Sequence, residues 1–170
     1  MKKDLFGDSL NAANLNQNDV VFTPLKIAKM IISEMNPMGF VLDPCRGGGA
    51  FYNQLPDPKG WCEIAEGRNF YDWEGNVEWI ISNPPYSDWD RWMDHSFKVA
   101  ENVAYILPVG KVFNSYGRVV KIKNYGGIVR IIFIQARACG FPFGFPVGIF
   151  HFKRGYDGDT KIEYIDGHGL

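Results

Sequence analysis

The chain has 170 residues, a formal net charge of −1, and a composition that is 46% hydrophobic and 22% charged. This length suits one domain built around one hydrophobic core. No apolar run approaches the roughly 18 residues that a membrane-spanning helix needs, so we expect no membrane association. Because the net charge is close to zero, any nucleic-acid surface must come from local clusters of basic residues.

The first residues differ in character from the rest of the chain. Residues 1–19 are polar and rich in asparagine, so we expect a loosely held arm, and no apolar segment follows its basic start to make a signal peptide. Residues 20–170 contain no linker or repeat and are predicted to form a single domain. Cys45, Cys62 and Cys139 are too far apart for a disulfide framework or a zinc site, which favours a cytoplasmic protein without a metal.

Helical and extended segments alternate from residue 22 onward. The expected helices are Leu25–Met35, a helix start at Ala50–Leu55, Trp89–Ala100 and Lys111–Asn124. Thr23 is the expected N-cap of the first helix, with Pro24 at its first helical position, and Gly126-Gly127 would close the last helix. The expected strands are Phe40–Leu42, Trp61–Ile64, Val77–Ser82, Val103–Leu107, Ile128–Ile134, Val147–Lys153 and Lys161–Ile165, while Asn69–Trp73 is a loop or a short strand.

This alternation predicts an α/β fold. Apolar strands separated by helical segments indicate βαβ units and a mostly parallel sheet that helices cover on both faces. The two β-rich runs at Ile128–Ile134 and Val147–Lys153 have no obvious helix between them, so we expect an antiparallel pair at one edge.

The most informative motif is Asn83-Pro84-Pro85-Tyr86, which follows the apolar run of the third expected strand. Two successive prolines fix two φ angles and remove two backbone donors, which leaves a stiff loop with free carbonyl acceptors. The Asn83 side-chain oxygen and the Pro84 carbonyl can accept both hydrogens of an exocyclic amine. The Tyr86 ring can stack on the face of the base that carries this amine.

Aromatic amines need such a grip because their nitrogen lone pair is delocalised into the ring. Two acceptors placed out of the ring plane favour a more tetrahedral nitrogen and localise the pair. Preorganised dipoles and a correctly aimed electrophile are then sufficient, without a strong base. The motif therefore predicts amine modification, with Asn83, Pro84, Pro85 and Tyr86 as the catalytic residues.

A second group of residues indicates a nucleoside cofactor without phosphates. Asp43 and the triplet Gly47-Gly48-Gly49 follow the first strand, where ligands of open α/β sheets bind. The loop lacks the Lys-Ser/Thr ending of a phosphate-binding loop. Glu63, at the end of the second strand, can bind both ribose hydroxyls, and Asn69-Phe70 offers an amide and a ring for an adenine. This set points to S-adenosylmethionine.

The motifs together resemble one known family. They occur in the order of the gamma-type adenine-specific (N6) DNA methyltransferases of the amino-methyltransferase class, and most resemble small phage-type members. The resemblance covers residues 20–110 well and the rest by topology. It rests on Phe22-Thr23-Pro24, Asp43-Pro44-Cys45-Arg46-Gly47-Gly48-Gly49-Ala50-Phe51, Cys62-Glu63-Ile64, Asn69-Phe70 and Asn83-Pro84-Pro85-Tyr86.

The resemblance implies a class I S-adenosylmethionine-dependent methyltransferase fold, a Rossmann-like sheet of seven strands, and a role for each motif. The methionine end of the cofactor would lie against Phe22, Thr23 and Pro24. Its amino-acid portion would be held by Asp43, Pro44, Gly47 and Gly49, its ribose by Glu63, and its adenine by Asn69 and Phe70. The family usually has aspartate where this chain has Asn69.

The resemblance also implies a nucleic-acid substrate in the cytoplasm of a bacterial or phage-infected cell. The target adenine of DNA would flip out of its helix to be held by Asn83, Pro84 and Tyr86, with Phe143 as a second wall. Lys111 and Arg118, beside Lys121 and Lys123, form the best candidate for a basic surface.

Several alternatives stay open. Gamma-type enzymes carry a long target-recognition domain, but the residues after Pro108 are consumed by the core fold, so we expect no separate one here. Specificity would then be low, or a homodimer mate or a partner subunit would supply recognition, or the substrate would not be duplex DNA. RNA base amines are the leading alternative substrate. A protein glutamine methyltransferase, and a catalytically silent subunit that binds cofactor or nucleic acid, are the remaining readings.

Overall fold

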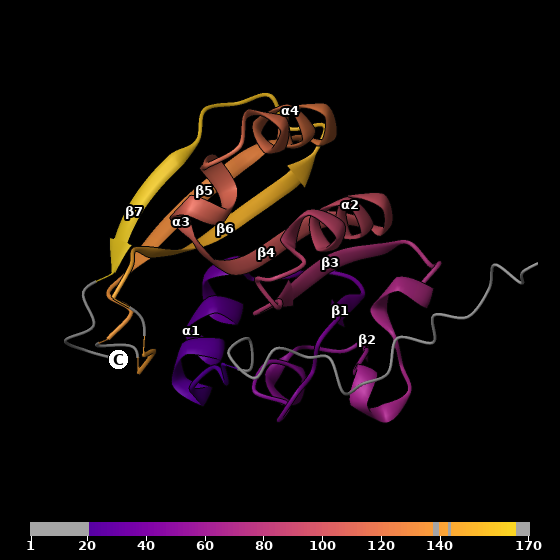
Figure 1. Cartoon of the computed structure of the whole chain (residues 1–170). Helices are drawn as coiled ribbons and strands as arrows, with labels where there is room; N and C mark the ends of the chain where they lie inside the picture. The colour runs from indigo at the N-terminus through magenta and orange to yellow at the C-terminus, as the bar shows by residue number, and fades with distance from the viewer. Residues whose placement is uncertain (1–20, 138–139, 143, 166–170) are drawn as a thin grey trace, which may run out of the picture.

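The computed structural model describes residues 21–137, 140–142 and 144–165. In this part of the chain, strands join into one seven-stranded sheet in the order β2-β1-β3-β4-β6-β5-β7 (Figure 1). The strands are β1 (Val41–Asp43), β2 (Lys59–Trp61), β3 (Val77–Ser82), β4 (Ala100–Pro108), β5 (Gly126–Ile134), β6 (Val147–Arg154) and β7 (Lys161–Ile165).

Most neighbouring strands are parallel. β1 pairs in parallel with β2 and β3, β3 with β4, and β5 with β7. β6 runs antiparallel to both of its neighbours, β4 and β5. The expected antiparallel pairing of β5 with β6 is therefore confirmed, and β7 extends the sheet beyond it as the outermost strand.

Helices cover both faces of the sheet. The α-helices are α1 (Leu25–Met35), α2 (Trp89–Val99), α3 (Val109–Phe113) and α4 (Tyr116–Tyr125). Figure 1 shows α1 on one side of the central strands and α2 and α4 on the other. Short 3-10 helices occupy three connections: η3 (Tyr52–Gln54), η4 (Ile64–Glu66) and η5 (Phe70–Asp72).

The core consists of two layers that the strand pleat separates. Successive side chains of a strand point to opposite faces of the sheet. In β4, Tyr105 and Leu107 belong to the layer under α2, α3 and α4, whereas Ala104 and Ile106 belong to the layer under α1. All four are fully buried, as expected for a central strand that helices cover on both faces.

The structure corrects the predicted start of the first helix. Leu25 is the first helical residue, Pro24 takes the N-cap position, and no side chain caps the helix. The Pro24 carbonyl instead accepts hydrogen bonds from the backbone N–H groups of Ile27 and Ala28, at 2.9 and 3.1 Å. Thr23, the predicted N-cap, is buried one residue earlier.

The structure also corrects the predicted single helix at Lys111–Asn124. Two helices, α3 and α4, replace it, with a break between Phe113 and Tyr116. Gly126 is the C-cap of α4 and its backbone N–H donates to the Ile122 carbonyl, so the predicted closure by glycine is confirmed there; Gly126 and Gly127 are also the first residues of β5. Gly126 has a φ of 157°, and a Cβ there would lie 2.3 Å from the Lys153 carbonyl oxygen, so the glycine allows the tight entry into the sheet.

Three shorter segments also differ from expectation. The helix start at Ala50–Leu55 is the single 3-10 turn η3, since Pro56 follows it. The second strand ends at Trp61, before Glu63. Asn69–Trp73 contains η5 instead of a strand. No helix of the described segments is long and apolar enough to cross a membrane, and the predicted arm at 1–19 lies outside the described residues.

Candidate functional site

Polar and glycine-rich segments meet beyond the carboxyl ends of β1, β2 and β3, where ligands of open α/β sheets bind. The parallel register places Asp43 of β1 opposite Trp61 of β2, and Leu42 opposite Ile80 of β3. The glycine loop, Glu63 and the Asn83–Tyr86 tetrad therefore leave the sheet side by side. The sequence-predicted motifs between Asp43 and Tyr86 are thus brought together at one edge of the sheet.

A buried carboxylate connects the first of these segments to the third. Asp43 has no exposed surface. Its carboxylate accepts hydrogen bonds from the Ser82 hydroxyl at 2.7 Å and from the backbone N–H groups of Tyr52 and Cys45, at 3.1 and 3.4 Å. Burial raises the pKa of Asp43 to about 6, an effect that these three hydrogen bonds oppose.

Cys45 extends this network to the tetrad. Its thiol lies 3.2 Å from the Ser82 hydroxyl and donates to the Asn83 backbone carbonyl at 3.3 Å. Burial, reinforced by the Asp43 carboxylate, raises the pKa of the Cys45 thiol, so the group stays protonated. A chain of contacts from Asp43 through Ser82 and Cys45 to Asn83 thus joins the glycine loop to the tetrad. Sequence analysis did not single out Ser82, although its position directly before the tetrad could have indicated this role.

The glycine loop packs against Glu63 and Phe22. The Gly47 backbone N–H donates to the Glu63 carboxylate at 2.7 Å, and the Ala65 N–H donates to its other oxygen at 3.2 Å. A Cβ added at Gly47 or Gly48 would lie 3.8 Å from the Phe22 ring, which is 69% exposed. Open backbone, a carboxylate and an accessible ring therefore face one another.

Two glycines of this loop have conformations that L side chains rarely adopt. Gly47 has a φ of 50° and Gly49 a φ of 82°, and a Cβ at Gly49 would lie 2.7 Å from the Asn53 side-chain nitrogen. Glycine is needed there because it alone combines a positive φ with so close an approach. Pro44 is buried between Asp43 and this turn.

Two hydrogen bonds orient the Asn83 amide of the tetrad. The Asn83 side-chain nitrogen donates to the Val21 carbonyl at 3.2 Å, which ties the tetrad to the Phe22-Thr23-Pro24 segment. The Tyr86 hydroxyl donates to the Asn83 side-chain oxygen at 2.8 Å. Pro84 is buried, whereas Asn83, Pro85 and Tyr86 are half-buried. The amide of Asn83 is therefore already oriented, with its oxygen directed toward the aromatic end of the loop.

Asn69 and Phe70, the two residues predicted to contact an adenine, differ in their local environment. The Asn69 side-chain oxygen accepts from the Tyr71 backbone N–H at 3.2 Å and caps η5. Phe70 is only 3% exposed and stacks on Trp92, with ring centroids 4.8 Å apart. Its ring thus belongs to the core under α2. Tyr71, which sequence reasoning did not single out, donates from its hydroxyl to Asp88 at 3.0 Å and so links η5 to the segment after the tetrad.

Trp61 is a further residue that the sequence did not reveal. The guanidinium groups of Arg46 and Arg68 lie 4.0 and 3.9 Å from its ring centroid, on the loops after β1 and β2. Arg46 also pairs with Glu66. These contacts fix the loop that carries Glu63 against the glycine loop.

The predicted basic surface is partly neutralised. Arg118 makes a two-point ion pair with Asp90, at 2.9 and 2.7 Å, which raises the pKa of Arg118. Lys121 pairs with Asp94 at 2.6 Å. Lys111 has no ion pair within the described ranges, and Lys123 is exposed. Phe143, the predicted second wall for a flipped base, lies outside the described residues.

The described residues contain no cluster of His, Cys, Asp or Glu suited to a metal ion. Neither protein-family models nor curated proteins gave a match to the chain. Solved structures, in contrast, gave matches over most of the chain. A Vibrio vulnificus protein assigned as a type I restriction-enzyme modification subunit superposes with a TM-score of 0.65 at 14% identity, over 89% of this chain and 48% of its own.

Two further structures have the same fold. A Listeria monocytogenes protein assigned as a class I S-adenosylmethionine-dependent methyltransferase gives a TM-score of 0.62 at 13% identity, over 85% of this chain and 65% of its own. The EcoKI M protein of a type I restriction enzyme gives a TM-score of 0.61 at 12% identity, over 85% of this chain and 48% of its own. The chain therefore has the class I S-adenosylmethionine-dependent methyltransferase fold and spans about half to two thirds of the length of these structures.

Proposed function

We propose that the chain transfers a methyl group from S-adenosylmethionine to the exocyclic N6 amine of adenine in DNA, acting directly on a flipped-out base. The observation that carries this proposal is the direct contact between the Asn83–Tyr86 tetrad and the glycine loop. The Asn83–Tyr86 tetrad contacts the glycine loop through Cys45 and the Phe22 segment through Val21. A base-gripping loop and a nucleoside-binding loop thus share one site.

The residues at this site fit the cofactor. A Cβ at Gly47 or Gly48 would touch the Phe22 ring at 3.8 Å, so the two glycines keep this part of the loop clear of side chains. Phe22, Thr23 and Pro24 would border the methionine end, and Gly47 and Gly49 its amino-acid portion, with Asp43 and Pro44 supporting the loop. The Glu63 carboxylate would exchange its bond from the Gly47 N–H for ribose hydroxyls. Asn69 would meet the adenine edge, with Phe70 packed beneath it.

The tetrad would prepare the amine for attack. The target amine competes with the Tyr86 hydroxyl for the Asn83 side-chain oxygen and donates its second hydrogen to the Pro84 carbonyl. When bound, the cofactor supplies an electrophilic methyl group on a sulfonium. Held by these two acceptors, the amine would direct its lone pair at that methyl group, take it as the C–S bond breaks, and then release one proton to solvent. Pro85 keeps the loop stiff, and the Tyr86 ring covers the base.

Substrate contacts beyond the base involve the basic residues that we predicted. Lys111 would contact phosphate, and Arg118 would support it while paired with Asp90. The neighbours from type I restriction-modification systems, one of them described for its complex assembly, favour a DNA substrate and a partner subunit that adds recognition. A homodimer mate could take the same role, and we place the protein in the cytoplasm of a bacterial or phage-infected cell. RNA is the second candidate, because a Pyrococcus horikoshii protein assigned as an RNA methyltransferase superposes with a TM-score of 0.53.

The test is transfer of labelled methyl from S-adenosylmethionine to duplex DNA, single-stranded DNA, RNA and total protein in parallel, followed by nucleoside analysis. Label in N6-methyladenine from DNA is the expected result. Label confined to RNA or protein would keep the chemistry and replace the substrate. Cofactor binding without label anywhere would contradict the enzymatic proposal.

A further inference from the structure

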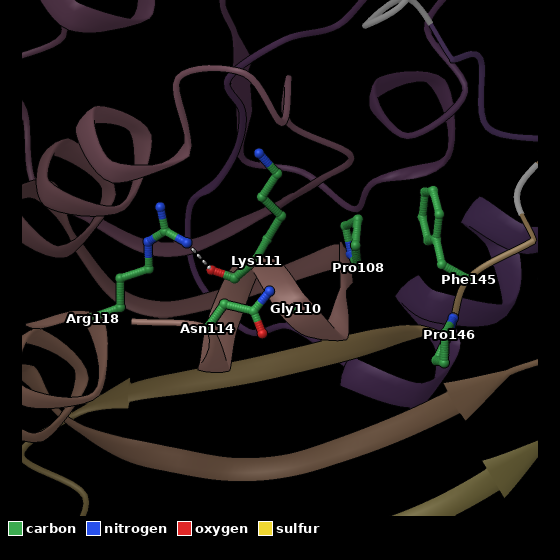
Figure 2. Close-up of a pocket in the computed structure, with 7 residues that line it drawn as sticks. All are labelled: Pro108, Gly110, Lys111, Asn114, Arg118, Phe145 and Pro146. Atoms are coloured by element: carbon green, nitrogen blue, oxygen red, sulfur yellow. Dashed lines mark hydrogen bonds between the residues drawn. The ribbon is translucent and has the colours of Figure 1, made fainter. Parts of the chain in front are cut away.

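A cleft at the carboxyl end of β4 lies outside the loops that would hold the cofactor and the target base, and it includes two of the predicted basic residues. It has a volume of about 320 Å³, and its lining includes Pro108, Lys111, Asn114, Arg118, Phe145 and Pro146. Figure 2 shows Phe145 and Pro146 on one side of it and Arg118 on the other, with Lys111 and Asn114 between. This volume falls in the range of small-molecule sites, at the lower end.

The register of the sheet places this cleft next to the tetrad. Ser82, which precedes the tetrad, pairs with Tyr105 on β4, so Pro108 extends three residues further in the same direction. Three strand residues span roughly 10 Å. That is about the length of three stacked nucleotides of one strand, each rising roughly 3.4 Å. The cleft therefore lies within the reach of a few nucleotides from Asn83.

The walls of the cleft are fixed by hydrogen bonds. The Val109 backbone N–H donates to the Pro146 carbonyl at 3.1 Å and joins the β4 end to the start of β6. The Arg118 guanidinium donates to the Lys111 carbonyl at 3.0 Å, and its ion pair with Asp90 ties α4 to α2. The cleft is therefore built into the domain, and its shape does not depend on an exposed loop alone.

Its chemistry combines three elements of nucleotide recognition. Phe145 is 45% exposed and lines the cleft with Pro108 and Pro146, and an aromatic ring is a group on which any base can stack. Lys111 is a cation without an ion pair among the residues that the structure describes. The exposed Asn114 amide carries a donor and an acceptor side by side, the pattern with which asparagine reads a base edge.

We propose that this cleft holds a nucleotide that flanks the target adenine and gives the enzyme a base preference at that position. Phe145 stacks on the flanking base, Asn114 reads its edge, and Lys111 neutralises its phosphate. Arg118 positions Lys111 through the carbonyl bond and does not contact the nucleic acid. This inference rests on the proposed function, since the target adenine defines the flank.

The test uses the purified full chain with single DNA strands that contain one adenine between randomised bases. Methylated strands are sequenced for wild type, Asn114→Ala and Lys111→Gln, with Asn76→Ala and Lys153→Gln as exposed controls. Wild type should favour one base at one flanking position by about fivefold or more, and Asn114→Ala should erase this preference. Lys111→Gln should slow methylation equally for all strands and lower the salt dependence by about one phosphate contact. Both controls should behave as wild type.

A second measurement separates failure of the cleft from failure of the proposed function. Anisotropy with a fluorescent form of the same strands reports binding when no methyl is transferred. Weaker binding by Asn114→Ala and Lys111→Gln, without transfer, would overturn the enzymatic proposal and keep the cleft as a nucleotide site. Even use of all flanking bases by an active wild type would overturn the cleft assignment. So would a preference that survives Asn114→Ala, or binding that neither variant changes.

Discussion

At the scale of single residues, Asp43 is a buried member of a site motif, and its carboxylate contacts other parts of the protein. Both carboxylate oxygens are occupied by hydrogen bonds from Ser82, Cys45 and Tyr52, and the residue has no exposed surface. Its principal effect is therefore on the shape of the glycine loop. Buried polar groups stabilise a fold only while their hydrogen-bond partners remain in place.

Replacing Ser82 with alanine removes the shortest of these bonds. Because the buried carboxylate then loses a donor, Ser82→Ala should lower the free energy of unfolding by about 1–3 kcal/mol at neutral pH. The same bond lowers the pKa of Asp43, so that pKa should rise above its value of about 6. Urea unfolding and NMR titration of the carboxyl carbon measure the two effects. Exposed Ser87→Ala is the matched control, and equal behaviour of the two variants would contradict this account.

His151 gives a prediction about pH. Its Nε2 lies 3.0 Å from the Asn102 side-chain oxygen and its ring lies on Trp79 at 4.9 Å. Burial, with Lys153 and Arg130 nearby, lowers the pKa of His151 to about 4. Between about pH 6.5 and 4 the unfolded chain thus binds more protons, so stability falls as pH falls.

The expected loss from this residue is roughly 3 kcal/mol between pH 7 and pH 4. Asp43, with its raised pKa, has the opposite effect over the same range, so the measurement must be a difference. Denaturant unfolding of wild type and His151→Gln across this range isolates the histidine, since glutamine keeps a donor for Asn102. Stability curves that stay parallel would refute the assignment.

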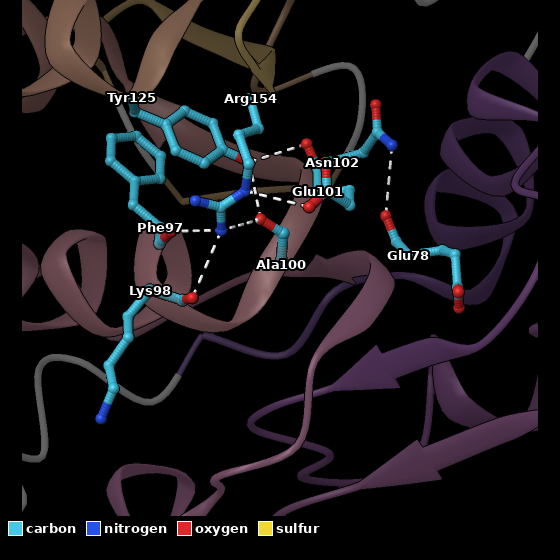
Figure 3. Close-up of polar contacts among 8 residues, drawn as sticks. All are labelled: Glu78, Phe97, Lys98, Ala100, Glu101, Asn102, Tyr125 and Arg154. Carbon is cyan, nitrogen blue, oxygen red and sulfur yellow. Dashed lines mark hydrogen bonds and ion pairs between the residues drawn. The ribbon is translucent and has the colours of Figure 1, made fainter.

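At the scale of elements, Arg154 connects the end of β6 to the end of α2 (Figure 3). Its guanidinium donates to the carbonyls of Phe97 and Ala100, at 2.7 and 2.8 Å, and pairs with Glu101 at 3.0 Å. The last carbonyls of a helix lack partners inside the helix, and a cation there also opposes the helix dipole.

Arg154→Met should therefore lower the free energy of unfolding by about 1.5–3 kcal/mol, the range for hydrogen bonds to a charged group. Hydrogen exchange should accelerate most in the last turn of α2. Lys153→Met is the control, because Lys153 is exposed and precedes Arg154 in the same strand. Equal loss of stability in both variants would show that the carbonyl contacts contribute little.

The elements also show which parts of the fold the sequence could predict. Leu25–Met35 and Val77–Ser82 match their expected ranges, because their apolar patterns match the burial that the structure shows. The break between α3 and α4 was not visible in the pattern, and neither was the bond from the Arg118 guanidinium to the Lys111 carbonyl across it. Likewise, Phe70 was expected to meet an adenine, and no local signal revealed that α2 would bury its ring against Trp92.

At the scale of the whole molecule, the predicted motifs converge because parallel strands deliver their carboxyl ends to one edge. Motif order alone was enough to predict that convergence. The contacts that join the loops, through Cys45, Trp61 and Tyr71, depend on tertiary packing and were not visible in the sequence.

A ligand that binds at the carboxyl ends of β1, β2 and β3, where these motifs meet, should stabilise the entire domain. At a concentration 100 times its dissociation constant, S-adenosylmethionine should raise the free energy of unfolding by about 2.7 kcal/mol, or roughly 5 to 10 °C in Tm. Thermal unfolding with and without the cofactor measures this. Glu63→Ala should remove most of the shift, whereas exposed Glu74→Ala should keep it; a full shift in Glu63→Ala would place the cofactor elsewhere.

The central claim is that the tetrad grips the amine while separate loops bind the cofactor. The most direct measurement is single-turnover methyl transfer to adenine-containing DNA by Asn83→Ala, together with its affinity for S-adenosylmethionine and with Asn76→Ala as the control. Transfer should fall by about a hundredfold or more, as for loss of a preorganised polar group, while cofactor affinity stays near that of wild type. Transfer at the wild-type rate, or loss of cofactor affinity in step with transfer, would contradict the account.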